Sequence, residues 1–187
     1  FGVWAADLEM DGDLDLVVAS LTGPPIVLQN NADGSWTSLS LFQDIEALRA
    51  FAWSDFDMDG DPDAALIGQA GQLALYENQQ AGQFRRWESP SLPDLVTLVA
   101  GELDGDGQLD VGVIDRDGGL WRVSHRDDVW TAIAVAEWTR VGDVEPGEVR
   151  LLVADFDNNG ASDMLASGPL GTDLWQRDPG GYRHLEI

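Results

Sequence analysis

The stretch Asp55-Phe-Asp-Met-Asp-Gly-Asp-Pro-Asp63 places five carboxylates on alternate positions within nine residues, with a glycine at the sixth position. Negative charges this close repel one another unless a cation lies among them. Alternate side chains in a tight turn can direct their oxygens to one centre, and the glycine lets the backbone bend around it. Oxygen ligands without histidine or cysteine suit a hard cation, and Ca²⁺ is the best match.

The same pattern occurs four times along the chain. Its copies, loops 1 to 4, are Asp7–Asp15, Asp55–Asp63, Glu102–Asp110 and Asp155–Asp163, and all fit (D/E)-x-(D/E)-x-(D/N)-G-x-x-D. Their first residues lie 48, 47 and 53 positions apart, and the loops hold half of the 34 acidic residues of the chain. A period of this length indicates a repeat architecture.

Short apolar runs flank every loop in the same phase. They precede the loops at 1–6, 49–54, 96–101 and 149–154, follow them at 16–19, 64–67, 111–114 and 164–166, and recur at 26–29, 73–76, 120–123 and 173–176. Runs of three to six residues rich in Val, Leu and Ile are typical of buried strands. A turn, an aromatic residue (Trp36, Phe84, Trp130 or Tyr182) and a less regular fourth strand complete each unit.

Four strands in about 40–50 residues make the unit of a β-propeller blade. The sequence therefore predicts an all-β fold with four blades of four antiparallel strands, bounded approximately at 1–48, 49–95, 96–148 and 149–187. The segment 43–51 has a weak helical period, and we interpret it as a loop leading into the second blade. Because no spare strand completes the first blade by exchange, we expect an incomplete set from a larger propeller rather than a closed four-bladed ring.

The composition narrows the function classes. A formal charge of −24 argues against nucleic acid and anionic membrane surfaces as partners. No cysteine is present, which excludes disulfides, thiolate metal sites and cysteine nucleophiles. No run approaches 18 apolar residues, so the sequence predicts no membrane insertion. The chain begins at Phe1 without a signal peptide, and we interpret it as a processed or excised piece.

These residues resemble the FG-GAP/VCBS repeat family, whose best-known members are the calcium-bearing blades of integrin α-subunit propellers. The resemblance covers essentially the whole chain. It implies that positions 1, 3, 5 and 9 of each loop offer side-chain oxygens to Ca²⁺, in up to four sites: Asp7, Glu9, Asp11, Asp15; Asp55, Asp57, Asp59, Asp63; Glu102, Asp104, Asp106, Asp110; Asp155, Asp157, Asn159, Asp163. It also implies backbone carbonyl ligands at position 7, from Asp13, Asp61, Gln108 and Ala161.

Some positions depart from the family pattern. Glu9 and Glu102 are one methylene longer than the expected aspartate, so the geometry of their loops must adjust. Asn159 removes one charge, which predicts weaker binding at loop 4. Pro62 lacks an N–H and could loosen the turn into the second strand of its blade.

Other interpretations of these residues are less well supported. An EF-hand needs a glutamate at its twelfth position, where these loops have Val18, Leu66, Val113 and Ala166. His125 and His184 have no consistent carboxylate or serine partner in the sequence, so we assign them no catalytic role. The tryptophans at 36, 53 and 130 are predicted to be core residues. Trp87 and Trp138 lie outside the repeat phase and are predicted contacts for a partner.

The sequence thus predicts a calcium-stabilised, non-enzymatic binding or scaffold module located outside the cell, in the periplasm or on the cell surface. Its partner would be a protein or a glycan on a loop face, alongside the remaining blades of a larger propeller. Two alternatives stay open: an accessory or partial propeller domain of a secreted polysaccharide-active enzyme, and a subunit of a larger extracytoplasmic complex.

Overall fold

The computed structural model describes residues 2–20, 22–80, 82–145 and 147–187, and Phe1, where the first apolar run was expected to begin, lies outside these ranges. All regular structure in these ranges is β. The strands are β1 (Val3–Ala6), β2 (Asp15–Val18), β3 (Ile26–Asn30), β4 (Trp36–Leu39), β5 (Ala50–Ser54), β6 (Asp63–Ile67), β7 (Leu73–Asn78), β8 (Phe84–Arg86), β9 (Leu95–Gly101), β10 (Asp110–Asp115), β11 (Gly119–Arg126), β12 (Val129–Glu137), β13 (Arg150–Ala154), β14 (Asp163–Gly168), β15 (Gly171–Asp178) and β16 (Gly181–Glu186). Nowhere in the described ranges is there a helix able to span a membrane.

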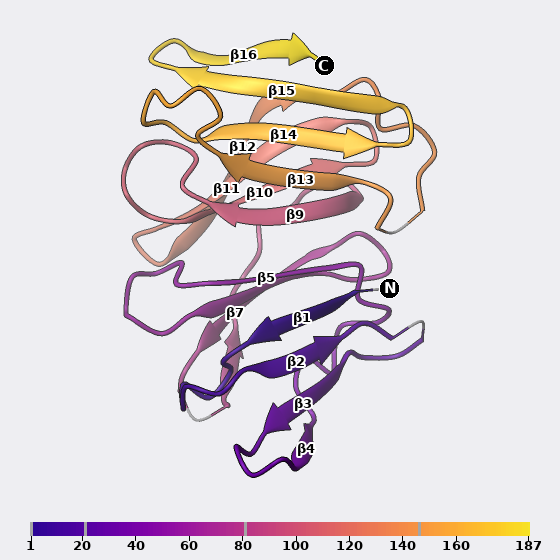
Figure 1. Ribbon diagram of the computed structural model, residues 1–187, viewed down its shortest axis with the longest axis vertical. Coiled ribbons are helices and arrows are strands. Elements are labelled where there is room, and N and C mark those ends of the chain that lie inside the picture. Colours follow the sequence, from indigo (N-terminus) through magenta and orange to yellow (C-terminus); the bar gives the residue numbers. More distant parts are fainter. Residues whose placement is uncertain (1, 21, 81, 146) are drawn as a thin grey trace.

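The strands form four separate antiparallel sheets, each made of four strands in chain order, here called blades 1 to 4 (Figure 1). The second strands of the middle blades, β6 and β10, are buried at every residue. Neighbouring blades cover both faces of these strands, and this explains why the residues beside their terminal aspartates are continuously apolar rather than alternating. The prediction of four four-stranded antiparallel blades is confirmed.

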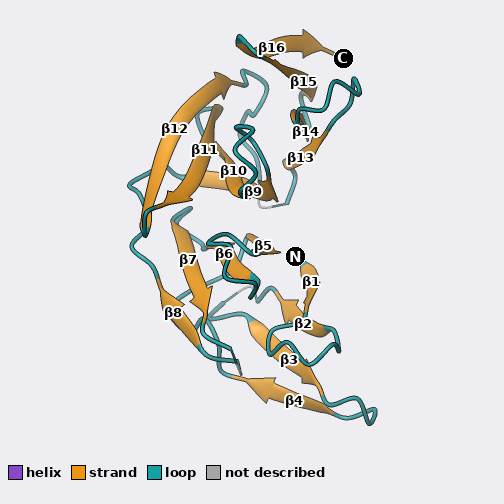
Figure 2. Ribbon diagram, turned by 90° about the vertical axis from the view of Figure 1, so that its left-hand side faces the viewer, coloured by secondary structure: helices purple, strands orange, loops and turns teal. Residues whose placement is uncertain are grey.

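The blades follow one another along an arc, with blades 1 and 4 at its two ends (Figure 2). The first strands β1, β5, β9 and β13 face the inside of the arc, and residues of all four line one cavity of about 420 Å³. The outer strands β4, β8 and β12 lie along the outside. This is the arrangement of blades around the axis of a β-propeller.

Three apolar clusters hold consecutive blades together. One joins blades 1 and 2, a second joins blades 2 and 3, and a third joins blades 3 and 4. Each inner blade uses alternate residues on its two faces: in blade 2, Phe51 and Leu66 pack toward blade 1, whereas Ala65 and Leu75 pack toward blade 3. Within the described ranges, no cluster joins blade 4 to blade 1.

The repeated aromatic of each blade points back to the preceding blade. Trp130 packs edge-on against Phe56 of loop 2, with ring centroids 5.7 Å apart. The hydroxyl of Tyr182 donates to the carbonyl of Leu103 in loop 3, at 3.1 Å. Trp36 was predicted to be a core residue by the same rule, and this is wrong: it is 47% exposed, because no described blade precedes blade 1.

An ion-pair network links blade 2 to blade 3. The carboxylate of Asp94, just before β9, pairs with Arg49 before β5 at 3.0 Å and with Arg116 after β10 at 2.9 Å. Partial burial works to raise the pKa of Asp94, but the hydrogen bonds and charges of Arg116 and Arg49 outweigh it and leave the pKa lowered. The folded state therefore favours the ionised carboxylate.

We expect Asp94→Asn to lower the free energy of unfolding near neutral pH by no more than about 1 kcal/mol, because the pair is partly exposed. A lowered pKa in the folded state stabilises above the unfolded pKa of about 3.9, and this stabilisation is lost as the pH falls through the folded pKa. The difference in melting temperature between wild type and variant should therefore narrow below about pH 4. Asp128→Asn, in an exposed turn outside the network, is the control; a difference independent of pH would contradict the prediction.

Candidate metal sites in the acidic loops

Each acidic loop joins the first and second strands of its blade. The glycine at position 6 adopts a left-handed conformation in all four loops, with φ between 86° and 98° at Gly12, Gly60, Gly107 and Gly160. Position 4 is also left-handed, even where it is not glycine, as at Met58 with φ of 64°. A left-handed backbone conformation is unfavourable for residues other than glycine. The side-chain hydrogen bonds of each loop therefore hold it in this shape.

Carboxylates inside each loop bind its backbone. The first residue accepts from the glycine at position 6 in loops 1, 2 and 4, as in the contact of Asp55 Oδ2 with Gly60 N at 3.2 Å. The side chain at position 5 accepts from the N–H at position 7 in every loop, at 2.7–2.9 Å. These bonds turn the loop inward and bring its carboxylates close together.

The aspartate at position 9 is the anchor of each loop. It is fully buried in all four copies, Asp15, Asp63, Asp110 and Asp163. One oxygen accepts from the backbone N–H at position 2, at 2.9–3.0 Å. In loops 1, 2 and 4 the other oxygen accepts from a backbone N–H at the end of the third strand, at 2.8–2.9 Å. This residue therefore ties the loop to the blade.

In loops 2, 3 and 4, ligand oxygens from three acidic residues lie within 4.8 Å of one another: Asp55, Asp57, Asp63; Glu102, Asp104, Asp110; Asp155, Asp157, Asp163. Ca²⁺ takes oxygen ligands at about 2.3–2.6 Å, so two ligands of one ion lie no more than about 5 Å apart. Asp55 Oδ1 and Asp110 Oδ1 are buried and have no hydrogen-bond partner among the described residues. The oxygen-only donor sets and these two unpaired oxygens fit a calcium ion.

Loop 1 differs from the other three. No three of its acidic residues, all of which are described, come together in this way. Glu9 accepts a hydrogen bond from Gln29 of the third strand, as Asp157 of loop 4 does from Gln176. The adjustment expected for the glutamate at position 3 stays a prediction. The predicted carbonyl ligands at position 7 stay predictions.

Burial opposes ionisation of several loop carboxylates. Burial raises the pKa of Asp63 to about 7, against the effect of two backbone hydrogen bonds. Burial also raises the pKa of Asp57 and of Asp110, with further contributions from neighbouring carboxylates. A bound cation would favour the ionised forms, so the loops are arranged to take one up.

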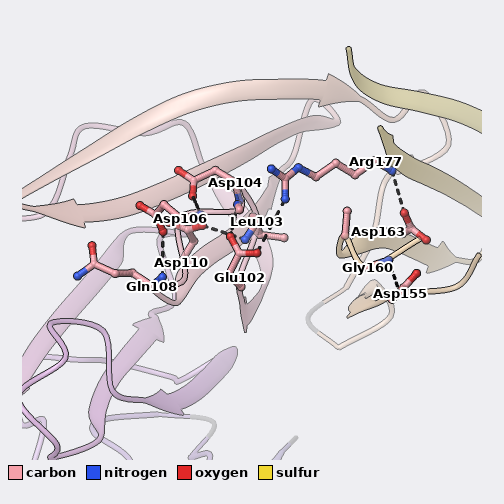
Figure 3. A network of polar contacts seen from close by, with 12 residues as sticks. Glu102, Leu103, Asp104, Asp106, Gln108, Asp110, Asp155, Gly160, Asp163 and Arg177 are labelled. Atoms are coloured by element: carbon pink, nitrogen blue, oxygen red, sulfur yellow. Dashed lines mark hydrogen bonds and ion pairs between the residues drawn. The ribbon is translucent and has the colours of Figure 1, made fainter. Parts of the chain in front are cut away.

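Loop 3 contains its own cations. Arg126, at the end of β11, contacts Asp106 and lies 3.5 Å from Asp104 Oδ2 and 3.7 Å from Asp110 Oδ1. Arg122 lies 3.2 Å from Asp104, and Arg177 of blade 4 lies 3.9 Å from Glu102 (Figure 3). The four predicted side-chain ligands of loop 3 therefore all lie next to an arginine.

The sequence interpretation missed these arginines, although a signal was present. The position of Arg126 at the end of the third strand is held in the other blades by Asn31, Gln79 and Asp178, which carry no positive charge. A basic residue in only one of four equivalent positions marks that loop as different. In loop 4, Asn159 donates a hydrogen bond to the carbonyl of Arg177 at 2.8 Å, and the weaker binding of this loop stays a prediction.

A cleft of about 330 Å³ lies between loops 3 and 4. Glu102 and Gly105 line it from blade 3, and Asn159 and Arg177 line it from blade 4. The guanidinium of Arg177 extends toward loop 3 while its backbone N–H donates to Asp163 (Figure 3). Blade 4 thus shapes the surroundings of the acidic loop of blade 3.

Of the two predicted partner contacts, Trp138 is buried, and the role of Trp87 stays a prediction. Trp138 is 1% exposed and donates its indole N–H to Asp173 at 2.8 Å, so its assignment as a partner contact is wrong. Trp87 is half-buried and packs against His125 and Trp130, with ring centroids 5.1 and 5.5 Å away. His184 stacks on Trp175 and lies 3.3 Å from Asp173. Trp87 and Trp138 thus pack against the apolar clusters between blades, at positions that the repeat pattern does not specify.

Loops 1 to 3 lie in a part of the chain that matches a known sequence repeat. The profile of the FG-GAP-like repeat matches residues 7–66 and 55–113, which together make up more than half of the chain and contain loops 1 to 3. The chain belongs to the FG-GAP-like repeat family. The FG-GAP-like profile thus spans consecutive blades and confirms the resemblance seen in the sequence.

The solved structures similar to this FG-GAP-like chain include a lectin from Agrocybe aegerita that recognises non-reducing terminal N-acetylglucosamine. The TM-score is 0.64 and the sequence identity 19%, over 97% of this chain and 50% of the lectin chain. At this identity the likeness shows the fold alone, and the chain spans half the length of that lectin. No curated protein matches the sequence.

Proposed function

We propose that the chain is a calcium-stabilised, non-enzymatic binding module that works outside the cytoplasm. The observation that carries this proposal is the convergence of oxygen ligands in three loops at equivalent positions of consecutive blades. Without a cation, their carboxylates repel one another and are costly to ionise where they are buried. In loops 2 and 4, calcium would join the two ends of the loop and fix the angle between the first two strands of the blade.

The proposed location follows from the affinity expected of such loops. Loops with this ligand charge suit the millimolar calcium found outside cells, where modules bind with dissociation constants of about 10⁻⁴–10⁻³ M. Secreted, periplasmic and surface proteins all meet this condition. Submicromolar calcium would leave such sites empty.

The non-enzymatic role is supported by the state of the titratable groups. The acidic clusters are engaged with their own backbones and, in loop 3, with arginines. His125 is buried between Trp87 and Trp130. Groups committed in this way are poorly placed to transfer protons to a substrate.

A protein or a glycan bound at the loop edge is the proposed partner. The cleft between loops 3 and 4 offers Arg177 and Asn159 as hydrogen-bond donors beside a rim of carboxylates. The fold shared with a lectin for terminal N-acetylglucosamine supports the glycan. A glycan array probed with and without calcium would distinguish a glycan from a protein partner.

Calcium should raise the melting temperature, and a chelator should lower it. At ten times its dissociation constant, one occupied site adds about 1.4 kcal/mol, which for a chain of this size is about 3–6 °C. Replacing Asp57 and Asp59 together by asparagine should remove the share of loop 2, and Asp33→Asn, in an exposed turn outside the loops, is the matched control. Equal melting temperatures in calcium and in chelator would exclude calcium stabilisation.

A further inference from the structure

Blade 3 differs from the two blades before it in its outer strand, β12. This strand is nine residues long and contains no charged residue before Glu137 at its end. The outer strands of blades 1 and 2 are short, with four residues in β4 and three in β8, and two of those three are arginines. Short length and charge protect a strand edge from pairing with another chain, and β12 has neither protection along its first eight residues.

The edge of β12 is regular over six residues. From Val129 to Ala134 the strand pairs with β11 residue by residue, and the register shifts only beyond that stretch. The edge lies on the outside of the arc (Figure 2), and among the described residues β12 pairs with β11 alone. Apolar clusters join blade 3 to blades 2 and 4. Further blades added at either end of the arc would therefore leave this edge open.

The turn before β12 determines which backbone groups face outward. Asp127 and Asp128 are both left-handed, with φ of 51° and 60°, as in the two-residue type I′ turn of a hairpin. In such a hairpin the flanking residues, here Arg126 and Val129, exchange both backbone hydrogen bonds, and bonded and non-bonded pairs alternate from there. The residues whose N–H and C=O groups point away from β11 are therefore Trp130, Ala132 and Ala134.

The side chains along this edge are apolar in the middle and acidic at both ends. Val129 and Ile133 are 57% and 52% exposed. Asp127 and Asp128 precede the strand, Glu137 ends it, and all three are exposed. A second copy paired antiparallel along the same edge would bring the two aspartates of each copy near the glutamate of the other, and opposed like charges destabilise a strand pair. The edge therefore fits a strand with an apolar centre and basic ends better than it fits a second copy.

We propose that the outer edge of β12 binds an extended segment of a partner protein, which pairs with it as a fifth strand of blade 3. The segment has apolar side chains beside Val129 and Ile133, and basic residues at its ends that meet the exposed carboxylates. Backbone hydrogen bonds to the three outward-facing residues supply affinity, and the charges at the ends supply selectivity. This surface is separate from the cleft between loops 3 and 4, and it contains no predicted calcium ligand.

A fluorescent peptide of about ten residues tests this edge, with alternating valine and threonine in the middle and lysines at both ends. Fluorescence anisotropy should show saturable binding to the wild-type chain, whereas the same peptide with glutamates at its ends should not bind. Ile133→Lys places a charge in the middle of the edge and should weaken binding about tenfold. Leu170→Lys, at a residue 62% exposed in the turn before β15, is the matched control and should bind as wild type does.

The acidic end of the edge has a test of its own. Replacing Asp127 and Asp128 together by asparagine keeps residues that suit a type I′ turn and removes two charges. Binding of the lysine-ended peptide should weaken several-fold, and added salt should weaken binding to wild type in the same direction. This variant decides if Ile133→Lys fails to fold, as judged by circular dichroism.

Hydrogen exchange measured by NMR locates the bound peptide. The outward-facing amides of Trp130, Ala132 and Ala134 should exchange more slowly in the complex. The amides of Thr131 and Ile133, which already bond to β11, should change little. No binding by wild type, equal binding of the two peptides, or unchanged exchange at the three outward-facing amides would overturn the inference. A doubled mass of the chain alone in light scattering, lost in Ile133→Lys, would assign the edge to a second copy and overturn it as well.

Discussion

Asp63→Ala is expected to lower the free energy of unfolding by about 2–6 kcal/mol. The side chain is fully buried, and its two oxygens accept from Phe56 N at 3.0 Å and from Asn78 N at 2.9 Å. Its removal leaves two buried backbone donors without partners, and each unsatisfied donor costs about 1–3 kcal/mol. Urea denaturation in the presence of chelator measures this effect without any contribution from bound metal.

The equivalent residue of loop 3 provides an internal comparison. Asp110 accepts from Leu103 N at 3.0 Å, but its other oxygen has no hydrogen-bond partner in the described structure. Asp110→Ala should therefore cost about 1–3 kcal/mol, less than the change at Asp63. Asp61→Ala, which removes a carboxylate from the outer part of loop 2, is the matched control and should cost less than about 1 kcal/mol. If all three variants were equally stable, position 9 would not be the anchor of the loop.

Removing the charge of Arg126 should make loop 3 depend on calcium. In chelator, we expect Arg126→Gln to lower the free energy of unfolding by about 1–3 kcal/mol, between the values for exposed and buried ion pairs. The guanidinium contacts Asp106 and lies within 3.7 Å of Asp104 and Asp110. Its loss leaves Asp106 and Asp110 without their nearest cation, while Arg122 remains 3.2 Å from Asp104. The backbone hydrogen bond from Gln108 lowers the pKa of Asp106, and the charge of Arg126 adds to this effect.

Saturating calcium should reverse most of this loss, because the vacated carboxylates then form an ordinary acidic loop. Isothermal titration should also detect one more calcium ion bound per chain in the variant than in wild type. Arg85→Gln removes an arginine that pairs with Glu77 outside the loops and is itself 60% exposed, and it should change neither stability nor stoichiometry appreciably. An unchanged stoichiometry in Arg126→Gln would show that the arginine does not take the place of an ion.

The sequence was sufficient to predict the blades because four independent features recur in phase. The loop pattern marks the turn between the first two strands, and the apolar runs beside it can be buried only in sheets covered on both faces. The repeated glycine and the buried aspartate at position 9 were predictable for the same reason, since each fulfils one backbone requirement in every copy. Features that all copies share are therefore the ones that a single sequence reveals.

Features peculiar to one blade were not predictable in this way. Arg126 enters loop 3 from the end of the third strand, which the loop pattern does not include. Trp138 is buried, and its indole N–H donates a hydrogen bond to Asp173, a residue 35 positions further along the chain. Trp36 occupies the same repeat position as the buried Trp130, but its burial would need a preceding blade to pack against it. Each of these outcomes depends on a tertiary neighbour rather than on the local pattern.

The rule by which each blade receives an aromatic from the next makes the chain a linear array with a direction. In such an array, stability is close to a sum of terms for single units and for contacts between nearest neighbours. Duplicating a whole blade inserts one complete interface and disturbs none of the others, whereas reversing a blade would destroy two. A gene encoding this fold can therefore grow or shrink by one repeat at a time, provided that each repeat keeps its acidic loop before its aromatic residue.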